Sequence, residues 1–135
     1  MFKKHKYVIV CCMDFRLHRD VDRWMKKNRL VGDCDIVSVA GAGKDIVDNP
    51  NGFVMNQIAL SKKLHNSQTV VLIHHMDCGA YGGHGAFNNY EAERNFQIFQ
   101  MKKAAKIVQN KIRGLRIKIL LAHLHKQRGV EIEEV

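Results

Sequence analysis

The sequence contains one proline, and no stretch of it is dominated by serine, glycine or charge of one sign. These scarcities argue against a low-complexity linker or a disordered segment. The apolar fraction of 46% and the charged fraction of 26% are typical of an ordinary folded globular protein. Because 135 residues suit one hydrophobic core, we expect residues 1–135 to form a single domain.

Long apolar runs are also missing, since none approaches the roughly 20 residues that cross a bilayer. The run over residues 7–13 follows basic residues, but it ends at Asp14 and Arg16 without a small-residue cleavage site. We interpret it as a buried first strand and expect a cytoplasmic protein that does not enter a membrane. In that compartment, the four cysteines are expected to be thiols or metal ligands rather than disulfides.

Acidic residues are fewer than basic ones, 13 against 22, which gives a net charge of +9. Such an excess favours anionic partners, including nucleic acids. However, the sequence lacks finger-like Cys/His spacing, an aromatic RNA-binding motif and a basic zipper region. We therefore expect the basic side chains to form solvated helix faces, and we do not expect nucleic-acid binding.

The hydrophobic pattern predicts alternating strands and helices. Buried strands are expected over residues 7–13, 35–39, 69–74 and 117–122, and residues 129–135 are expected to add an edge strand. Helices are expected over residues 17–29, 53–64 and 90–111, the last capped by Asn89. This order predicts an α/β fold, a mainly parallel doubly wound sheet of order 2-1-3-4 with helices on both faces.

Chemically reactive side chains follow the first predicted strand. In extended chain alternate side chains share a face, so Cys12, Asp14 and Arg16 are expected to point into one site. Met13 and Phe15 are then expected to pack elsewhere.

A second motif, with His75 and Cys78 three residues apart, follows the third predicted strand. In a 2-1-3-4 sheet the first and third strands are neighbours, and ligands bind at their carboxyl ends. Two thiolates and one imidazole favour zinc, and three protein ligands leave a fourth position open, as in catalytic sites. The sequence therefore predicts a zinc site formed by Cys12, His75 and Cys78. The preceding His74 is expected to be packed or hydrogen-bonded rather than a ligand.

The two motifs together, Cys-x-Asp-x-Arg and His-x-x-Cys-Gly, each after an apolar strand, resemble the β-class carbonic anhydrases. This resemblance implies that Cys12, His75 and Cys78 bind Zn²⁺ and that Asp14 and Arg16 act as a catalytic pair beside a metal-bound hydroxide. The implied activity is the reversible hydration of carbon dioxide to bicarbonate. The resemblance also implies a homodimer or a higher homo-oligomer.

The sequence departs from the family pattern in three places. Residues 39–43 keep Gly41 and Gly43 but lack the usual Asn, so we expect a close backbone approach to the site with altered hydrogen bonding. Phe15 stands where Ser or Ala is usual and is expected to narrow the pocket. The helical N-terminal arm typical of the family is missing before the first strand, so the subunit interface is expected to differ in part.

Several alternatives remain open from the sequence. The same fold and metal would also suit a hydrolase of carbonyl sulfide or carbon disulfide, or a non-enzymatic zinc-binding regulatory protein. Asp14 is also a candidate fourth zinc ligand, or one half of a plain structural ion pair with Arg16. His84 and His18 are candidates for carrying the released proton to solvent.

Overall fold

The apolar runs of the sequence form the centre of a five-stranded sheet in a computed structural model that describes residues 6–125 and 129–135. The sheet order is β2-β1-β3-β4-β5. The strands are β1 (Lys6–Cys12), β2 (Cys34–Val39), β3 (Ser67–His75), β4 (Arg116–His125) and β5 (Gly129–Glu134). All neighbouring pairs are parallel except β4 and β5, which are antiparallel. The predicted 2-1-3-4 order and the additional edge strand are confirmed.

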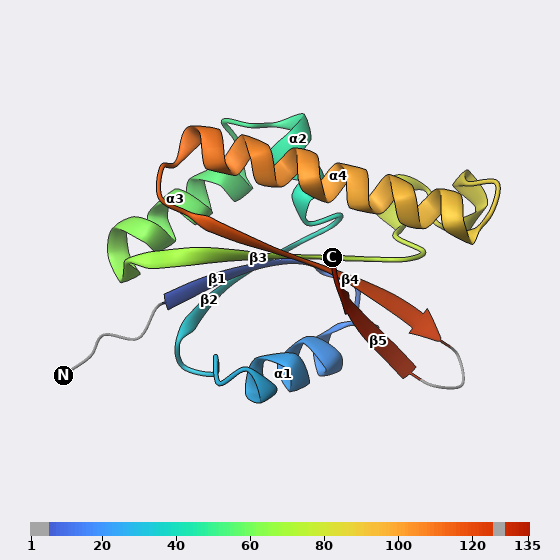
Figure 1. The fold of residues 1–135 in the computed structure, drawn as a ribbon, viewed down its shortest axis with the longest axis horizontal. Helices are drawn as coiled ribbons and strands as arrows, with labels where there is room; N and C mark the ends of the chain where they lie inside the picture. The colour runs from blue at the N-terminus through green and yellow to red at the C-terminus, as the bar shows by residue number, and fades with distance from the viewer. Residues whose placement is uncertain (1–5, 126–128) are drawn as a thin grey trace.

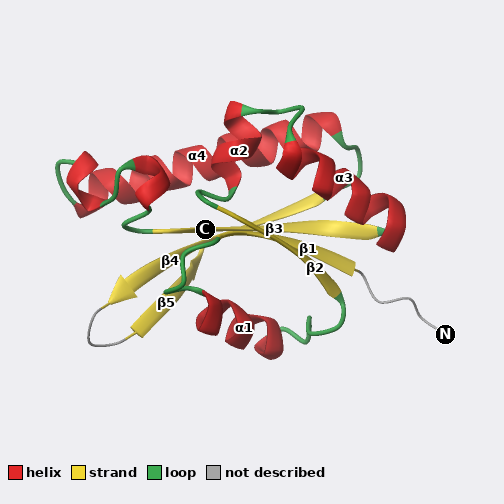
Figure 2. Cartoon of the chain, turned by 180° about the vertical axis from the view of Figure 1, so that it is seen from behind, coloured by secondary structure: helices red, strands yellow, loops and turns green. Residues whose placement is uncertain are grey.

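Helices cover both faces of the sheet, as predicted (Figures 1 and 2). α1 (His18–Lys27) lies alone on one face, and α2 (Gly43–Asp48), α3 (Phe53–His65) and α4 (Tyr90–Lys111) lie on the other. Two short 3₁₀ helices, η1 (Gly79–Tyr81) and η2 (His84–Ala86), lie between β3 and α4. α2 is not among the predicted helices, because six residues beginning at a glycine carry too little periodic signal.

Burial explains why these segments take these forms. β1 and β3 are covered on both faces, and their central aliphatic side chains have no exposed surface, as expected for inner parallel strands. α1 buries Val21 and Met25 and leaves its charged side chains outside. The side chain of Asn89 accepts a hydrogen bond from the backbone N–H of Ala92, which confirms the predicted cap of α4.

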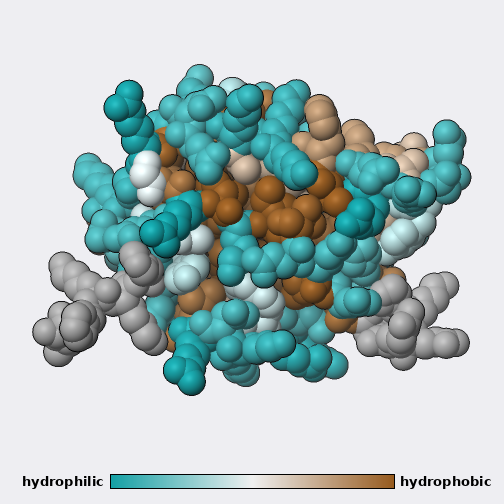
Figure 3. All heavy atoms as spheres, viewed as in Figure 1, coloured by the Kyte–Doolittle hydropathy of each residue, from teal (hydrophilic) through white to brown (hydrophobic). Residues whose placement is uncertain are grey.

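Hydrophilic side chains cover the outer surfaces of the helices on the face drawn in Figure 3, at the top where α4 lies and at the bottom where α1 lies. Apolar residues show between them, in the middle of the view. In the described part of the chain, no helix combines the length and the apolar character needed to cross a bilayer.

The register brings three strand ends to one edge of the sheet. Cys12 pairs with Val39 at the end of β2, and Cys11 pairs with Ile73 near the end of β3. From β1 the chain passes to β2 on one side and later to β3 on the other, which makes β1 the switch point of the sheet. The loops after β1, β2 and β3 therefore meet at this carboxyl edge.

Candidate metal centre

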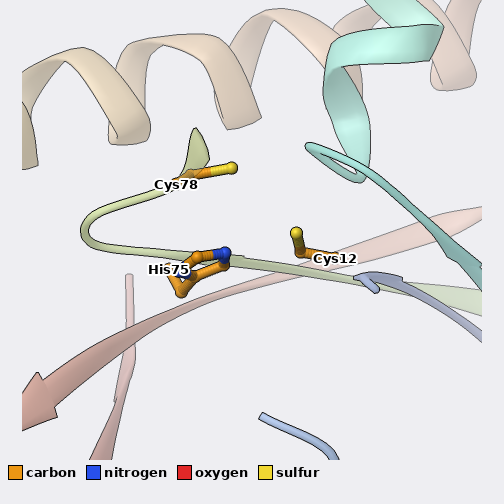
Figure 4. A group of neighbouring side chains, drawn as sticks. All are labelled: Cys12, His75 and Cys78. Atoms are coloured by element: carbon orange, nitrogen blue, oxygen red, sulfur yellow. The ribbon is translucent and has the colours of Figure 1, made fainter. Parts of the chain in front are cut away.

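The three predicted ligands converge at the carboxyl edge of the sheet. Cys12 ends β1, His75 ends β3, and Cys78 follows on the next loop (Figure 4). The two sulfur atoms and one imidazole nitrogen all lie within 4.8 Å of one another. The three residues are 7%, 0% and 3% exposed, respectively. Among residues 6–125 and 129–135, no other group of three or more His, Cys, Asp or Glu side chains is spaced to hold a metal ion.

The imidazole of His75 is fixed in one orientation and one tautomer. Its Nδ1 lies 2.7 Å from the backbone oxygen of Met76. Because a carbonyl oxygen only accepts hydrogen bonds, Nδ1 carries the proton and Nε2 has a free lone pair. Nε2 is buried and has no hydrogen-bond partner among the described residues. A buried nitrogen in this state is suited to binding a cation.

The two sulfur atoms differ in charge. The pKa of the Cys12 thiol is lowered, first because the Cys78 thiol donates a hydrogen bond to it, and also because of the nearby His75 and the Gly41 N–H. The same contact raises the pKa of Cys78, since its proton is held between the two sulfurs. A divalent cation placed among these atoms would stabilise both thiolates together.

The donor set therefore fits a zinc ion. It consists of two cysteine sulfurs and one imidazole nitrogen with its second nitrogen hydrogen-bonded to a carbonyl. Sulfur and imidazole donors are those that zinc prefers, and such a hydrogen bond behind the imidazole is typical of metal sites.

Asp14 and Arg16 form the expected pair beside this cluster. Arg16 donates from Nη2 to Asp14 Oδ2 at 2.7 Å and from Nε to Asp14 Oδ1 at 3.0 Å, and its backbone N–H donates to Oδ1 at 2.8 Å. These contacts lower the pKa of Asp14 to about 2, so the carboxylate is ionised at neutral pH. Asp14 Oδ2 lies 3.8 Å from Nε2 of His75. The pair thus presents a fixed hydrogen-bond acceptor at the edge of the cluster.

The glycine loop after β2 approaches the cluster, as expected. The backbone N–H of Gly41 donates to Cys12 Sγ at 3.4 Å, and Gly41 has a φ of +77°. A Cβ at Gly41 would come within 2.9 Å of the Cβ of Lys44 and 3.0 Å of the Cβ of Ala80. Only glycine combines this conformation with this close approach.

His74 is buried and hydrogen-bonded, as expected from the sequence. Its Nε2 accepts a hydrogen bond from the backbone N–H of Gly43 at 3.0 Å, and its Nδ1 lies 2.8 Å from Oε1 of Gln97. Burial lowers the pKa of His74 to about 4, so the ring is neutral at physiological pH. His74 therefore links β3 to α2 and α4 and lies outside the cluster.

One expectation about the first motif is wrong. Met13 and Phe15 were expected to pack elsewhere in the protein, but their side chains are 65% and 80% exposed. The alternation of a strand does not extend past Cys12, where β1 ends, so these residues lie on an open turn instead of in a core.

The structure adds three polar residues around the cluster. Asp77 accepts a hydrogen bond from Arg16 on its side chain at 3.1 Å, and its backbone N–H donates to Glu93 Oε2 at 2.6 Å. Glu93 also contacts the ring of His84, one of the two histidines proposed as proton carriers, whereas the other, His18, is exposed on α1. Gln97 holds His74. Glu93 and Gln97 are both buried on α4, but the sequence alone does not separate such residues from those of a solvated helix face.

Comparison with known proteins identifies a matching family and a relative of similar sequence. The model of a family described as "Putative carbonic anhydrase" matches residues 2–134. A protein of Rickettsia conorii described as uncharacterized is 28% identical over 124 residues, which are 87% of this chain and 67% of that protein.

Two solved structures share the fold. The β-carbonic anhydrase isoform I of Trichomonas vaginalis superposes with a TM-score of 0.67 at 17% identity, over 99% of this chain and 85% of that one. A tetrameric β-carbonic anhydrase of Sordaria macrospora gives a TM-score of 0.59 at 14% identity, over 99% of this chain and 82% of that one. At these identities the structural comparison establishes the fold, and the family match covers nearly the whole chain.

Proposed function

The chain belongs to this carbonic anhydrase family as a divergent β-class member, and on that premise we propose that it catalyses the zinc-dependent, reversible hydration of carbon dioxide to bicarbonate. The observation that carries the proposal is the convergence of Cys12, His75 and Cys78 beside an ionised carboxylate. The chemistry that zinc supplies when bound is Lewis-acid activation of water near neutral pH.

In this proposal, the three buried side chains hold the ion. Three protein donors would leave the ion one position for a ligand that the protein does not supply, as in catalytic rather than structural zinc sites. The Nδ1 hydrogen bond of His75 keeps Nε2 directed at the cluster. Burial of all three side chains limits the access of bulk water to this position.

Asp14 is proposed to orient the attacking water. Arg16 occupies its carboxylate from one side, so Asp14 stays ionised and Oδ2 remains near the cluster, 3.8 Å from His75 Nε2. From there it accepts a hydrogen bond from a water molecule, whose oxygen adds to the carbon of carbon dioxide. One proton of the water is released to solvent, and bicarbonate is the product.

The proposal is tested by measuring zinc content and carbon dioxide hydration on the same purified protein, with a pH indicator in a stopped-flow instrument. We expect about one zinc per chain, hydration well above the buffer rate, and loss of that activity after chelation with recovery on adding zinc. Zinc-loaded protein without hydration would contradict the proposal. Turnover of carbonyl sulfide or carbon disulfide by that sample would instead identify the hydrolase alternative.

Further parts of the proposal concern the whole chain. We propose that residues 1–135 act as one domain, that the protein works in the cytoplasm, and that it forms a homodimer or a higher homo-oligomer. The tetrameric state of the Sordaria macrospora enzyme supports self-association. Light scattering coupled to gel filtration tests this point, and a monomer at micromolar concentration would contradict it.

A further inference from the structure

The loop that carries two of the three predicted ligands contains a residue in an unfavourable backbone conformation. Asp77 lies between His75 and Cys78 and has a φ of +60°, in the left-handed region. A residue with a Cβ enters this region at a cost in free energy, so the surrounding contacts must hold it there. Because Asp77 sets the direction of the chain between the two donors, its conformation determines how they approach each other.

Each polar atom of Asp77 is held by a different contact. Its backbone N–H donates to Oε2 of Glu93 at 2.6 Å, and its backbone oxygen accepts from Nη2 of Arg16 at 3.1 Å. Oδ1 accepts from the backbone N–H of His84 at 2.9 Å, and Oδ2 accepts from Nη1 of Arg16 at 3.1 Å. Three of these four contacts come from exposed or half-buried groups, whereas Glu93 is 1% exposed.

Glu93 lies in the first turn of α4 but is not required to cap it. Asn89 caps this helix through Ala92, and the backbone N–H of Glu93 is itself bonded to the backbone oxygen of Asn89. Both carboxylate oxygens of Glu93 instead face the loop, Oε2 toward Asp77 and Oε1 toward Nδ1 of His84. Burying an acidic side chain is unfavourable unless it is well paired. This pairing is made entirely with the residues that follow the ligand His75.

We propose that Glu93 is a positioning residue that fixes the His75–Cys78 loop and thereby sets the affinity of the protein for zinc. The inference rests on the proposed zinc site. Glu93 does not contact the metal: it holds the N–H of Asp77, which holds the turn between the two donors. Partners of this kind, one step removed from the ligands, typically change metal affinity by about 10- to 100-fold.

The test measures the zinc dissociation constant of purified variants by competition with a chromophoric chelator. For Glu93→Ala we expect a dissociation constant about 10 to 100 times that of the wild type. For Glu93→Gln we expect a smaller increase, because the amide oxygen still accepts from the N–H of Asp77. Glu91→Gln is the matched control, an exposed acidic residue two positions earlier on α4, and its dissociation constant should stay within about twofold.

Melting temperatures of the metal-free proteins separate positioning from general stability. If Glu93 only stabilised the fold, its variants would melt earlier and bind zinc as tightly as the wild type, which would overturn the proposal. Should Glu93→Ala not fold, Glu93→Gln and His84→Ala decide, and unchanged zinc affinity in both overturns it. Wild-type protein that binds zinc without hydrating carbon dioxide would contradict the proposed function alone, since the affinity ratios would still stand.

Discussion

The two ends of the parallel sheet offer hollows of similar size but different chemistry. At the amino end, a hollow of about 220 Å³ is lined by residues that include Asp33, Asp35, His65 and Ser67. At the carboxyl end, a hollow of about 210 Å³ lies along α1; Cys12 and Asp14 are among its lining residues, whereas His75 and Cys78 are not. Both contain ionisable side chains, so neither volume nor polarity alone distinguishes a functional site from a structural one.

The difference lies in how the polar atoms are paired. At the amino end, Asp35 accepts from Ser61 Oγ at 2.6 Å and lies 2.8 Å from His65 Nδ1, and Ser61 lies 2.6 Å from Ser67. Across the described residues, the buried side-chain atoms that lack a hydrogen-bond partner are His75 Nε2, Tyr81 Oη and Gln97 Nε2. All three belong to β3, to the loop after Cys78 or to the helix that holds His74. A buried polar group without a protein partner leaves room for a bound ion or water, whereas a fully paired cluster stabilises the fold.

The largest expected effect comes from removing one sulfur at the carboxyl end. Cys78→Ala should lower zinc content from about one per chain to near zero and abolish hydration, because the loss of a direct ligand exceeds the roughly 10- to 100-fold effect of outer partners. Cys34→Ala, at the amino end, is the control and should keep both. Elemental analysis after dialysis measures the difference. Equal zinc content in the two variants would contradict the claim that the carboxyl end binds zinc and the amino end does not.

The next effect concerns the two aspartates. Asp14→Asn should lower the hydration rate by roughly 10²-fold or more and retain zinc, since it removes a charged acceptor near the reacting water. Asp35→Asn should leave the rate nearly unchanged. Stopped-flow hydration assays on zinc-loaded protein compare them. A rate for Asp14→Asn that matches the wild type would reduce the Asp14–Arg16 pair to a plain ion pair.

Two glycines with positive φ sharpen the comparison further. At the amino end, Gly32 has a φ of +84°, and a Cβ added there would have no atom within 4 Å. For Gly32→Ala we therefore expect a loss of about 1 kcal/mol in unfolding free energy, from backbone strain alone. Gly41→Ala has similar strain, and its Cβ would also lie 2.9 Å from that of Lys44. This crowding should cost about 1–3 kcal/mol more and weaken zinc binding. Urea titrations measure the unfolding free energy of both variants, and equal losses would contradict the close approach at Gly41.

The smallest effect is a pH-dependent change in stability at the amino end. Burial opposes ionisation of Asp35, but hydrogen bonds from Ser61 and His65 outweigh it and lower its pKa. A lowered pKa in the folded state adds stability above the unfolded value of about 4, and this stability is lost as pH falls below it. Asp35→Asn should therefore be about 1 kcal/mol less stable than the wild type at pH 7. The two proteins should converge as the pH falls below the lowered pKa of Asp35, and a constant difference would contradict this assignment.

The strands and the convergence of Cys12, His75 and Cys78 could be predicted from the sequence, because apolar runs and strand order are readable in it. Apolar runs such as residues 69–74 are specific for buried strands, and parallel topology then places Cys12 and His75 at one edge. The pattern is weaker where the chain turns. Phe15 follows the end of β1 and is exposed, although alternation predicted that it would pack.

The surroundings of the cluster were not predictable in the same way. Glu93 is 16 positions from Asp77, and its burial results from where α4 crosses the loop, which depends on tertiary packing. A glutamate in the first turn of a helix usually interacts with the helix N-terminus and with solvent. The left-handed conformation of Asp77 also has only a weak local signal, since aspartate adopts it more often than most residues but glycine is the usual residue there.

The most direct test of the central claim is X-ray absorption at the zinc edge on wild-type protein loaded with one equivalent of zinc. The account predicts two sulfur scatterers at about 2.3 Å and one imidazole nitrogen at about 2.0–2.1 Å. A spectrum with only oxygen and nitrogen neighbours, or one that Cys78→Ala leaves unchanged, would contradict it.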